Sequence, residues 1–264
     1  MELELLSRMP EERAKRTPVL FIHGAYSSAS IWEPFFLPFF ARHGYATYAL
    51  SLRGHGKSEG RERLGTTRLR DYVADVASVV DRLGVQPALV GTSMGGLVVQ
   101  NYMHQQPVGA VVLLASGAPY GVLPSMLHMA YRHPVLARDM TLMQLLGPRM
   151  ATVEGARRAL FREDTSDDYI RTHLPKAEAE SPWVLLDMLG LDLPPLTRRP
   201  DTPVLVLGAE RDAFVTQAAV ELTARRYGTT AEIFAGMPHA MMLDRDWERV
   251  AKRMLEWFDQ VIPA

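Results

Sequence analysis

Short runs of consecutive apolar residues recur along the chain and constrain its fold more than any other feature. They lie at Val19–Ile22, Tyr45–Leu50, Ala88–Val90, Val108–Leu114, Val204–Leu207 and Ala231–Phe234. Because neighbouring residues in most runs are apolar, both faces of each predicted strand are expected to be buried, as in a parallel sheet. Segments with apolar residues at helical spacing separate several runs, for example Tyr72–Leu83. This alternation predicts an α/β fold with a mostly parallel, doubly wound sheet.

The alternation stops between residues 120 and 199, where prolines are frequent and no strand-like run occurs. One helical piece, Pro134–Gly147, begins with proline, carries an apolar stripe and ends with glycine, the usual punctuation of a helix. We therefore predict a helical cap at residues 120–199, inserted into an α/β core made of residues 1–119 and 200–264. The insertion explains why 264 residues exceed one average domain of ~150 residues.

Composition and charge exclude several classes of protein. The 29 Lys and Arg residues against 30 Asp and Glu residues leave a net charge of −1, so we predict no nucleic-acid partner. The absence of cysteine excludes disulfide bonds, a thiol nucleophile and cysteine-ligated metal. The first residues lack the cationic start and apolar run of a signal peptide, and no apolar stretch is long enough to span a bilayer. We expect a cytoplasmic protein with no integral membrane segment; the sequence indicates no oligomeric state.

The sequence Gly91-Thr92-Ser93-Met94-Gly95 follows a predicted buried strand and precedes a predicted helix at Gly96–Met103. It matches the pattern G-x-S-x-G, in which a serine occupies a sharp turn between a strand and a helix. The backbone at such a turn is strained, so its near neighbours have to be glycine. The turn projects the hydroxyl group beyond the edge of the sheet. Ser93 is therefore the candidate nucleophile.

A serine nucleophile needs a base, and the base needs an acid that orients it. His239 follows the predicted strand Ala231–Phe234, and Asp212 follows the predicted strand Val204–Leu207. Both residues are therefore expected at the carboxyl edge of the sheet, where open α/β sheets bind ligands. The order Ser93, Asp212, His239 is the order of nucleophile, acid and base expected on this architecture.

Other residues compete for these roles. Glu210 is an alternative acid, and His55 and His104 are alternative bases. His104 lies in or just beyond the helix that follows Ser93, so we expect its side chain to point away from the site. The basic run at Arg61, Arg63, Arg68 and Arg70 is interpreted as a solvated face, with binding of a phosphate-bearing substrate as the alternative.

Cleavage of an acyl bond also needs N–H donors for the oxyanion of the tetrahedral intermediate. We expect one donor from the backbone of Met94, directly after Ser93. The second is expected at Ala25, in the loop after the first strong strand. Gly24 allows the backbone to approach closely, and Tyr26 is expected either to line the pocket or to contact the substrate through its phenol. This chemistry requires no metal and no organic cofactor.

With these residues assembled, the chain resembles the α/β-hydrolase superfamily over essentially its whole length. Within it, the chain is most similar to serine esterases of the monoacylglycerol lipase and lysophospholipase-like branch. The resemblance rests on His23-Gly24, Tyr45–Ser58 and Gly91–Gly96. In that branch the second stretch usually contains Asp-x-Arg-Gly-His-Gly-x-Ser, whereas this chain has Ser51 in place of the aspartate, and the residue before the nucleophile, often histidine, is Thr92. The resemblance implies an α/β-hydrolase fold with an inserted cap.

The chain has 14 methionines, and many lie in the predicted cap or beside the candidate site. Unbranched thioethers adapt to irregular apolar shapes, so we expect a pliable pocket for an acyl or alkyl group. The candidate pocket residues are Gly24, Tyr26, Met126, Met143, Trp183 and Met241. The predicted function is a serine hydrolase that cleaves small-molecule carboxylic esters with an apolar acyl or alkyl group. A thioester, a lactone or a carbon–carbon bond as substrate, or a non-catalytic receptor, are the alternatives.

Overall fold

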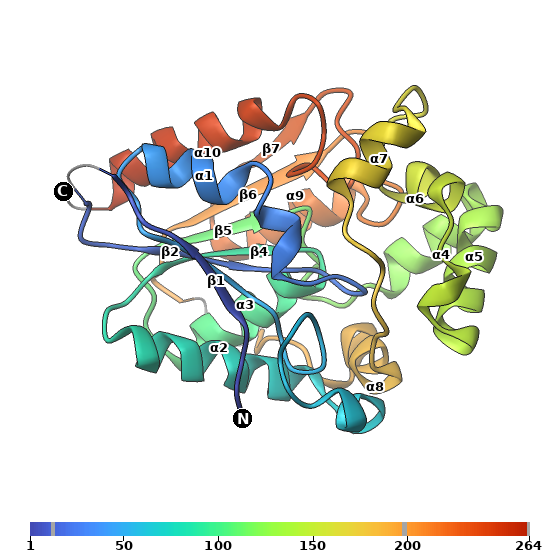
Figure 1. Ribbon diagram of the computed structural model, residues 1–264, viewed down its shortest axis with the longest axis horizontal. Helices are drawn as coiled ribbons and strands as arrows, with labels where there is room; N and C mark the ends of the chain where they lie inside the picture. Colours follow the sequence, from blue (N-terminus) through green and yellow to red (C-terminus); the bar gives the residue numbers. More distant parts are fainter. Residues whose placement is uncertain (12–13, 197–199, 263–264) are drawn as a thin grey trace.

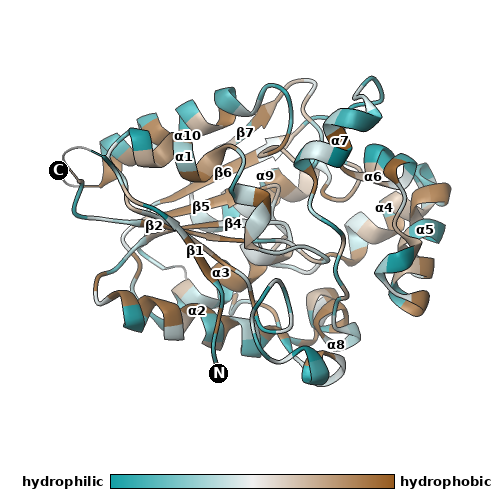
Figure 2. Ribbon diagram, in the orientation of Figure 1, coloured by the Kyte–Doolittle hydropathy of each residue, from teal (hydrophilic) through white to brown (hydrophobic). Residues whose placement is uncertain are grey.

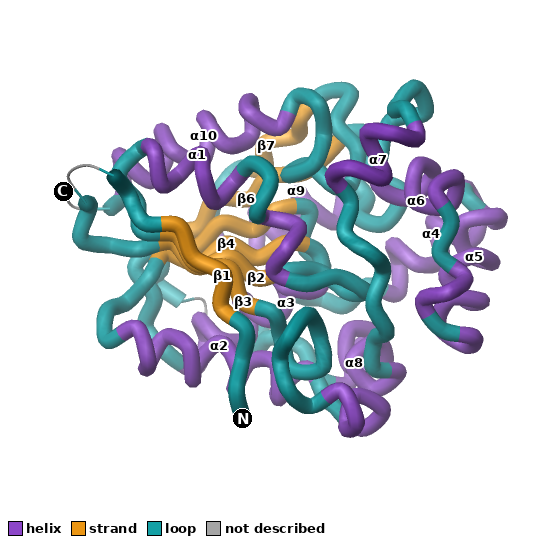
Figure 3. Tube along the Cα trace, in the orientation of Figure 1, coloured by secondary structure: helices purple, strands orange, loops and turns teal. Residues whose placement is uncertain are grey.

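A seven-stranded sheet forms the centre of the computed structural model, which describes residues 1–11, 14–196 and 200–262. The strands lie in the order β1-β3-β2-β4-β5-β6-β7. Their bounds are β1 Leu5–Arg8, β2 Val19–Ile22, β3 Thr47–Leu50, β4 Ala88–Thr92, β5 Val111–Leu114, β6 Val204–Ala209 and β7 Ala231–Phe234. Figure 3 shows the strands in orange with helices on both sides. The predicted α/β fold with a mostly parallel, doubly wound sheet is confirmed.

The strand β1 is the antiparallel member of the sheet and was not predicted from the sequence. It pairs with β3, with Leu5 opposite Leu50, whereas the other neighbouring strands pair in parallel. Its side chains are half-buried or exposed, so it lacks the continuous apolar run that marks the other strands. In the β2–β4 pair Ile22 lies opposite Gly91, and the loops that follow these two strands therefore begin side by side.

Helices cover both faces of the sheet (Figure 1). α1 (Phe36–Arg42) and α10 (Trp247–Val261) pack on one face, and α2 (Leu69–Leu83), α3 (Met94–Gln105) and α9 (Gln217–Tyr227) pack on the other. Two short 3-10 helices, η1 (Ala29–Trp32) and η2 (Arg61–Thr66), lie in loops. The side chains of β2 alternate between the two cores: Phe21 faces the α1 side and Leu20 the α2 side. This alternation explains the continuous apolar runs, which appear as brown strands in Figure 2.

In the described residues between β5 and β6, short helices alternate with turns and coil, and no strand occurs. Its elements are α4 Leu123–Arg132, α5 Pro134–Leu146, η3 Pro148–Met150, α6 Val153–Leu160, α7 Asp167–His173, α8 Pro182–Leu186 and η4 Asp187–Leu191. We call residues 123–191 the helical segment. New helices begin repeatedly in this segment, so each is short. The side chains of Thr152, Ser166 and Ser181 cap α6, α7 and α8 by accepting a hydrogen bond from a backbone N–H of the first turn. The ends of a cap at residues 120 and 199 stay a prediction, and residues 197–199 lie outside the described residues.

Within the described ranges, no helix is both long enough and apolar enough to cross a bilayer.

Candidate active site

Ser93 occupies a strained turn between β4 and α3. Its backbone has φ 53° and ψ −119°, a region that residues with a side chain rarely adopt. A Cβ atom on Gly95 would lie only 2.4 Å from the carbonyl oxygen of His23, so only glycine lets the first turn of α3 pack against the end of β2. The G-x-S-x-G pattern therefore forms the strand-to-helix turn that the sequence predicts, at the carboxyl edge of the sheet.

Asp212 and His239 meet at the same edge. The Nδ1 atom of His239 lies 2.7 Å from Oδ2 of Asp212, and both side chains are buried. The other carboxylate oxygen of Asp212 accepts backbone N–H groups from Phe214 at 2.8 Å and Val215 at 2.9 Å. These bonds fix the orientation of the carboxylate. With Nδ1–H donating to Asp212, Nε2 is the basic nitrogen of the imidazole.

The loop after β2 lies directly against the serine. A Cβ atom on Gly24 would lie 3.0 Å from the Cβ of Ser93 and 3.6 Å from its Oγ. The ring of His23 holds this loop: Nδ1–H donates to the carbonyl of Gly24 at 2.8 Å, and Nε2 accepts the N–H of Leu52 at 3.1 Å. Burial and the nearby His55 lower the pKa of His23 to about 3, so the ring is neutral and keeps both roles.

The two residues predicted to donate to an oxyanion flank this contact. Met94 is the first residue of α3, so its N–H has no acceptor within the helix. Ala25 follows Gly24 and is half-buried. Tyr26 has a positive φ of 61°, which turns the chain sharply after Ala25. Their N–H groups as oxyanion donors remain a prediction.

The helical segment bonds to the same loop through Tyr26. The phenol of Tyr26 donates to Oε1 of Gln144 on α5 at 2.7 Å, and its carbonyl accepts the N–H of Glu178 at 2.9 Å. Met143 adjoins Gln144 and is half-buried. Two parts of the helical segment are therefore bonded to the loop that follows Gly24.

The remaining predicted pocket residues are spread out. Met126 and Trp183 are each 44% exposed, and the ring of Trp183 lies 5.4 Å from the guanidinium of Arg68. Met241 has no exposed surface and packs in the core cluster that includes α1 and α10. This corrects the expectation that Met241 lines the pocket: its side chain packs in the core and does not face an open pocket.

Two hollows lie near these loops. One, of about 450 Å³, is lined mainly by loop residues between Ser28 and Arg61 and by residues 175–179. The other, of about 260 Å³, is lined by Arg162, Glu163, Asp164, Arg211, Gly236 and Arg245. Neither is lined by Ser93, Asp212 or His239.

The rival residues are engaged elsewhere. Glu210 accepts the N–H of Gly236 at 2.7 Å, so Asp212 is the acid that reaches His239. His55 is buried, with Nε2 3.3 Å from Oε2 of Glu180. Burial disfavours the charged imidazole of His55, but the Glu180 carboxylate, the Arg53 carbonyl and Glu178 together raise the pKa of His55. His104 lies near the ring of Tyr227 at the far end of α3.

The basic run is not uniformly solvated. Arg68 donates to Asp187 of η4 through Nε at 2.8 Å and also through Nη2, and the Asp187 carboxylate is buried. Arg61 pairs with Glu178 at 2.8 Å, whereas Arg63 is exposed. Arg68 thus ties the start of α2 to the helical segment, which corrects the expectation of a solvated face at this position.

Sequence reasoning missed one ring that touches the candidate base. Phe214 packs edge-on against His239, with ring centroids 4.9 Å apart. It also packs on the small apolar cluster of Met129, Leu136, Ala159 and Ala213, which joins the helical segment to the loop after β6. The sequence signal that could have identified Phe214 is its position two residues after Asp212, because a residue so close to the candidate acid lies near the site.

Comparisons with known proteins agree with this architecture. A non-heme chloroperoxidase of Streptomyces lividans is 38% identical over 106 residues, which cover 39% of this chain and 37% of that protein. A bifunctional esterase/perhydrolase of Acinetobacter calcoaceticus is 36% identical over 111 residues, covering 39% and 38%. The chain thus matches less than half the length of these relatives.

The crystal structure of a monoacylglycerol lipase from Paleococcus ferrophilus superposes with a TM-score of 0.70 at 20% identity, covering 97% of this chain and 98% of that one. At this identity the likeness shows the fold alone. A family model described as the alpha/beta hydrolase family matches residues 19–253. Since that match covers most of the chain, the protein belongs to the α/β-hydrolase family.

Proposed function

We propose that the protein is a serine hydrolase that cleaves carboxylic esters with an apolar acyl or alkyl group. The observation that carries the proposal is the pairing of a strained Ser93 turn with the 2.7 Å contact between His239 and Asp212 at the same sheet edge. A nucleophile, a base and an orienting acid are the groups that acyl transfer requires.

In this mechanism Nε2 of His239 takes the proton of Ser93 as Oγ attacks the ester carbonyl. Asp212 stabilises the imidazolium that forms, and the N–H groups of Ala25 and Met94 bind the oxyanion. The imidazolium then protonates the leaving alcohol, which yields an acyl-enzyme on Ser93. His239 then takes a proton from water as the water attacks the acyl-enzyme. The imidazolium returns this proton to Oγ of Ser93 as the acyl–Oγ bond breaks and the carboxylic acid leaves. Each oxyanion donor is worth about 3–4 kcal/mol of transition-state stabilisation in comparable enzymes.

The helical segment is proposed as the cap that binds the acyl or alkyl group. Its contacts with Tyr26 support this role, because they fix α5 to the loop whose Gly24 lies against Ser93. Met126, Met143 and Trp183 are the proposed apolar contacts. Both exposed residues, Met126 and Trp183, have surface left to bury against a substrate chain, and each buried CH₂ contributes ~0.8 kcal/mol.

A panel of p-nitrophenyl esters from acetate to decanoate tests the proposal, alongside a thioester, a lactone and a monoacylglycerol. We expect kcat/KM to rise from acetate to a chain of intermediate length, and Ser93→Ala to abolish turnover. Highest turnover on acetate with a steady decline would contradict the apolar pocket. Turnover of the thioester alone or the lactone alone would show that the substrate is of that class and not an open-chain carboxylic ester.

A further inference from the structure

The loop that carries His239 is held by the helical segment as well as by the sheet. This loop, residues 235–246, connects β7 to α10. The N–H of Ala240, next to His239, donates to the carbonyl of Leu160 at the end of α6 at 3.1 Å. The phenol of Tyr169 on α7 donates to the carbonyl of Leu243 at 3.1 Å. The backbone on the C-terminal side of His239 therefore depends on two elements that are distant in sequence.

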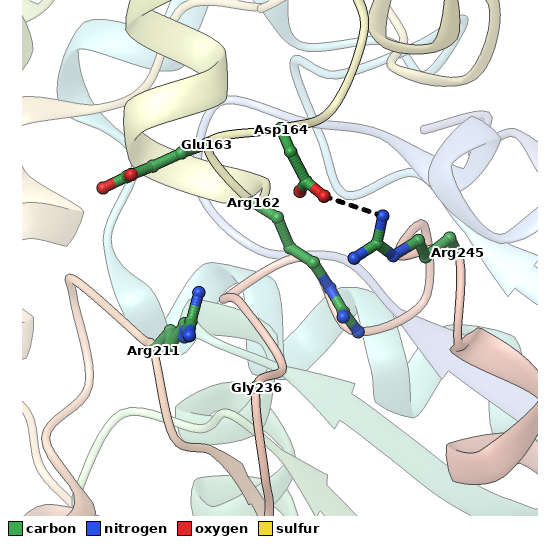
Figure 4. Close-up of a pocket in the computed structure, with 6 residues that line it drawn as sticks. All are labelled: Arg162, Glu163, Asp164, Arg211, Gly236 and Arg245. Carbon is green, nitrogen blue, oxygen red and sulfur yellow. Dashed lines mark hydrogen bonds and ion pairs between the residues drawn. The ribbon is translucent and has the colours of Figure 1, made fainter.

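Arg162 makes the strongest of these links. It lies between α6 and α7 and donates to both oxygens of Asp244, through Nε at 2.9 Å and Nη2 at 2.6 Å. Nη2 also donates to Asp246 at 2.6 Å. Figure 4 shows Arg162 extending from the helical segment toward the loop that carries Arg245, and Asp164 bonded to Arg245. A two-donor fork on one carboxylate fixes direction as well as distance.

Because Arg162 and Asp244 are both largely buried, each charge depends on the other. The side chain of Asp244 is 2% exposed and that of Arg162 is 12% exposed. The hydrogen bond to Asp244 raises the pKa of Arg162 above its usual value in spite of partial burial, so the guanidinium stays charged. Without the guanidinium of Arg162, Asp244 would be a buried carboxylate that has lost its paired cation, which is strongly unfavourable. The loop would then have to move to bring Asp244 to water.

Asp244 also shapes the loop itself. Its Oδ1 accepts the N–H of Asp246 at 2.9 Å, which closes the turn just before α10. The segment from Ala240 to Asp246 is thus fixed at Leu160, Arg162 and Tyr169. His239 is the residue directly before this segment.

We propose that Arg162 is a positioning residue for the reaction: acting through Asp244, it holds the His239 loop so that the imidazole keeps its contact with Asp212. The expected effect on kcat rests on the proposed function. The expected effect on the position of His239 rests on the loop contacts alone. The helical segment then contributes to proton transfer as well as to substrate binding.

Arg162→Met tests the proposal, with Arg158→Met as the matched control. The ion pairs of Arg158, with Asp139 and Glu154, stay within the helical segment. On p-nitrophenyl butyrate we expect Arg162→Met to lower kcat about 10- to 100-fold, the usual cost of a misplaced catalytic group, while KM changes less than about threefold. Arg158→Met should keep kcat within about twofold. Arg162→Lys should recover part of the loss, because lysine supplies the charge without the two-donor fork.

A second readout needs no substrate. The Nδ1 proton of His239, bonded to Asp212, should give a low-field proton NMR signal that Asp212→Asn removes. We expect the signal in the wild type and in Arg158→Met, and its loss or broadening in Arg162→Met. If no ester is hydrolysed but the signal follows this pattern, the proposed function fails and the positioning role stands.

A folded Arg162→Met variant with wild-type kcat and an unchanged signal would overturn the proposal, as would an equal kcat loss in Arg158→Met. If Arg162→Met does not fold, Arg162→Lys and Tyr169→Phe decide the matter. Both should lower kcat at constant KM and weaken the signal. Wild-type values in both would again overturn the positioning role.

Discussion

The imidazole of His239 and the carboxylate of Asp212 are joined by a 2.7 Å contact between Nδ1 and Oδ2. Two backbone N–H groups hold the other carboxylate oxygen, so Asp212 has little freedom to turn away. A fixed carboxylate selects the tautomer in which Nε2 of His239 is free to accept a proton. In the proposed mechanism, this arrangement leaves Nε2 of His239 to accept the proton of Ser93.

Replacing Asp212 by asparagine should lower kcat about 10³- to 10⁴-fold, because the amide can favour the wrong imidazole tautomer while leaving the geometry intact. Steady-state kinetics on p-nitrophenyl butyrate measure the effect. Glu210→Gln is the control, since Glu210 bonds to the backbone of Gly236 rather than to His239, and it should stay within a few-fold of the wild type. Equal losses of kcat in the two variants would show that Asp212 is not the acid that orients His239.

A methyl group at Gly24 should impair catalysis without unfolding the protein. The new Cβ would lie 3.0 Å from the Cβ of Ser93, so the loop after β2 would shift away from the serine. We expect kcat to fall about 10- to 100-fold, with a modest change in melting temperature. Gly109→Ala provides the comparison, because nothing lies within 4 Å of its added Cβ, and it should behave as the wild type. Unaltered kinetics for Gly24→Ala would argue against a close role of this loop.

The stability of the protein should fall as the pH decreases below about 6.5. The folded state lowers the pKa of His23 from 6.5 to about 3. Between those pH values the unfolded chain binds a proton that folded His23 does not, so the unfolded state gains stability as the pH falls. The raised pKa of His55 acts in the opposite direction, but above about pH 6.5, where only the folded state holds that proton. Comparing the wild type with a His23 variant cancels the contribution of His55.

Denaturant unfolding at pH 7.5, 6.0 and 5.0 of the wild type and His23→Gln provides that comparison. The glutamine variant should be less stable at pH 7.5, and the gap to the wild type should narrow toward pH 5.0. A gap that is constant across this range would show that His23 takes up its proton in the folded state.

The link between Asp187 and Arg68 should contribute to stability rather than to catalysis. Asp187 is buried and accepts bonds from the guanidinium of Arg68 and from the N–H of Leu69. Asp187→Ala leaves these donors unpaired, and we expect a loss of about 2–3 kcal/mol in the free energy of unfolding. Asp81→Ala, at an exposed position of α2, should change it by less than ~0.5 kcal/mol. Similar unfolding midpoints for the two variants would contradict the structural role of Asp187.

The sequence predicts the parts of this molecule that depend on local pattern. Buried strands such as Val19–Ile22 were recognisable because both of their faces pack in a core. The Ser93 turn was recognisable because its glycines form a short local pattern. At Gly91 the requirement is local, since a Cβ atom there would clash with Gly95 and Gly96. The positions of Asp212 and His239 followed from the strands that precede them.

Contacts between distant segments were not predictable. Arg162 and Asp244 are 82 residues apart in the chain, and nothing local distinguishes them from other charged residues that pair on the surface. The pairing of His55 with Glu180 also depends on how the helical segment returns to the core. The sequence shows that Met241 lies two residues after His239. It does not show which way the side chain points, because the conformation of the turn after His239 determines that direction.

Covalent labelling tests the identity of the nucleophile most directly. The wild-type protein, treated with a fluorophosphonate at neutral pH and analysed by intact mass and peptide mapping, should carry one adduct on the peptide that contains Ser93. Ser93→Ala should carry none, and His239→Ala should react far more slowly because its serine lacks a base. A wild-type protein that stays unlabelled while a known serine esterase reacts in the same tube, or that is labelled on another residue, would contradict Ser93 as the nucleophile.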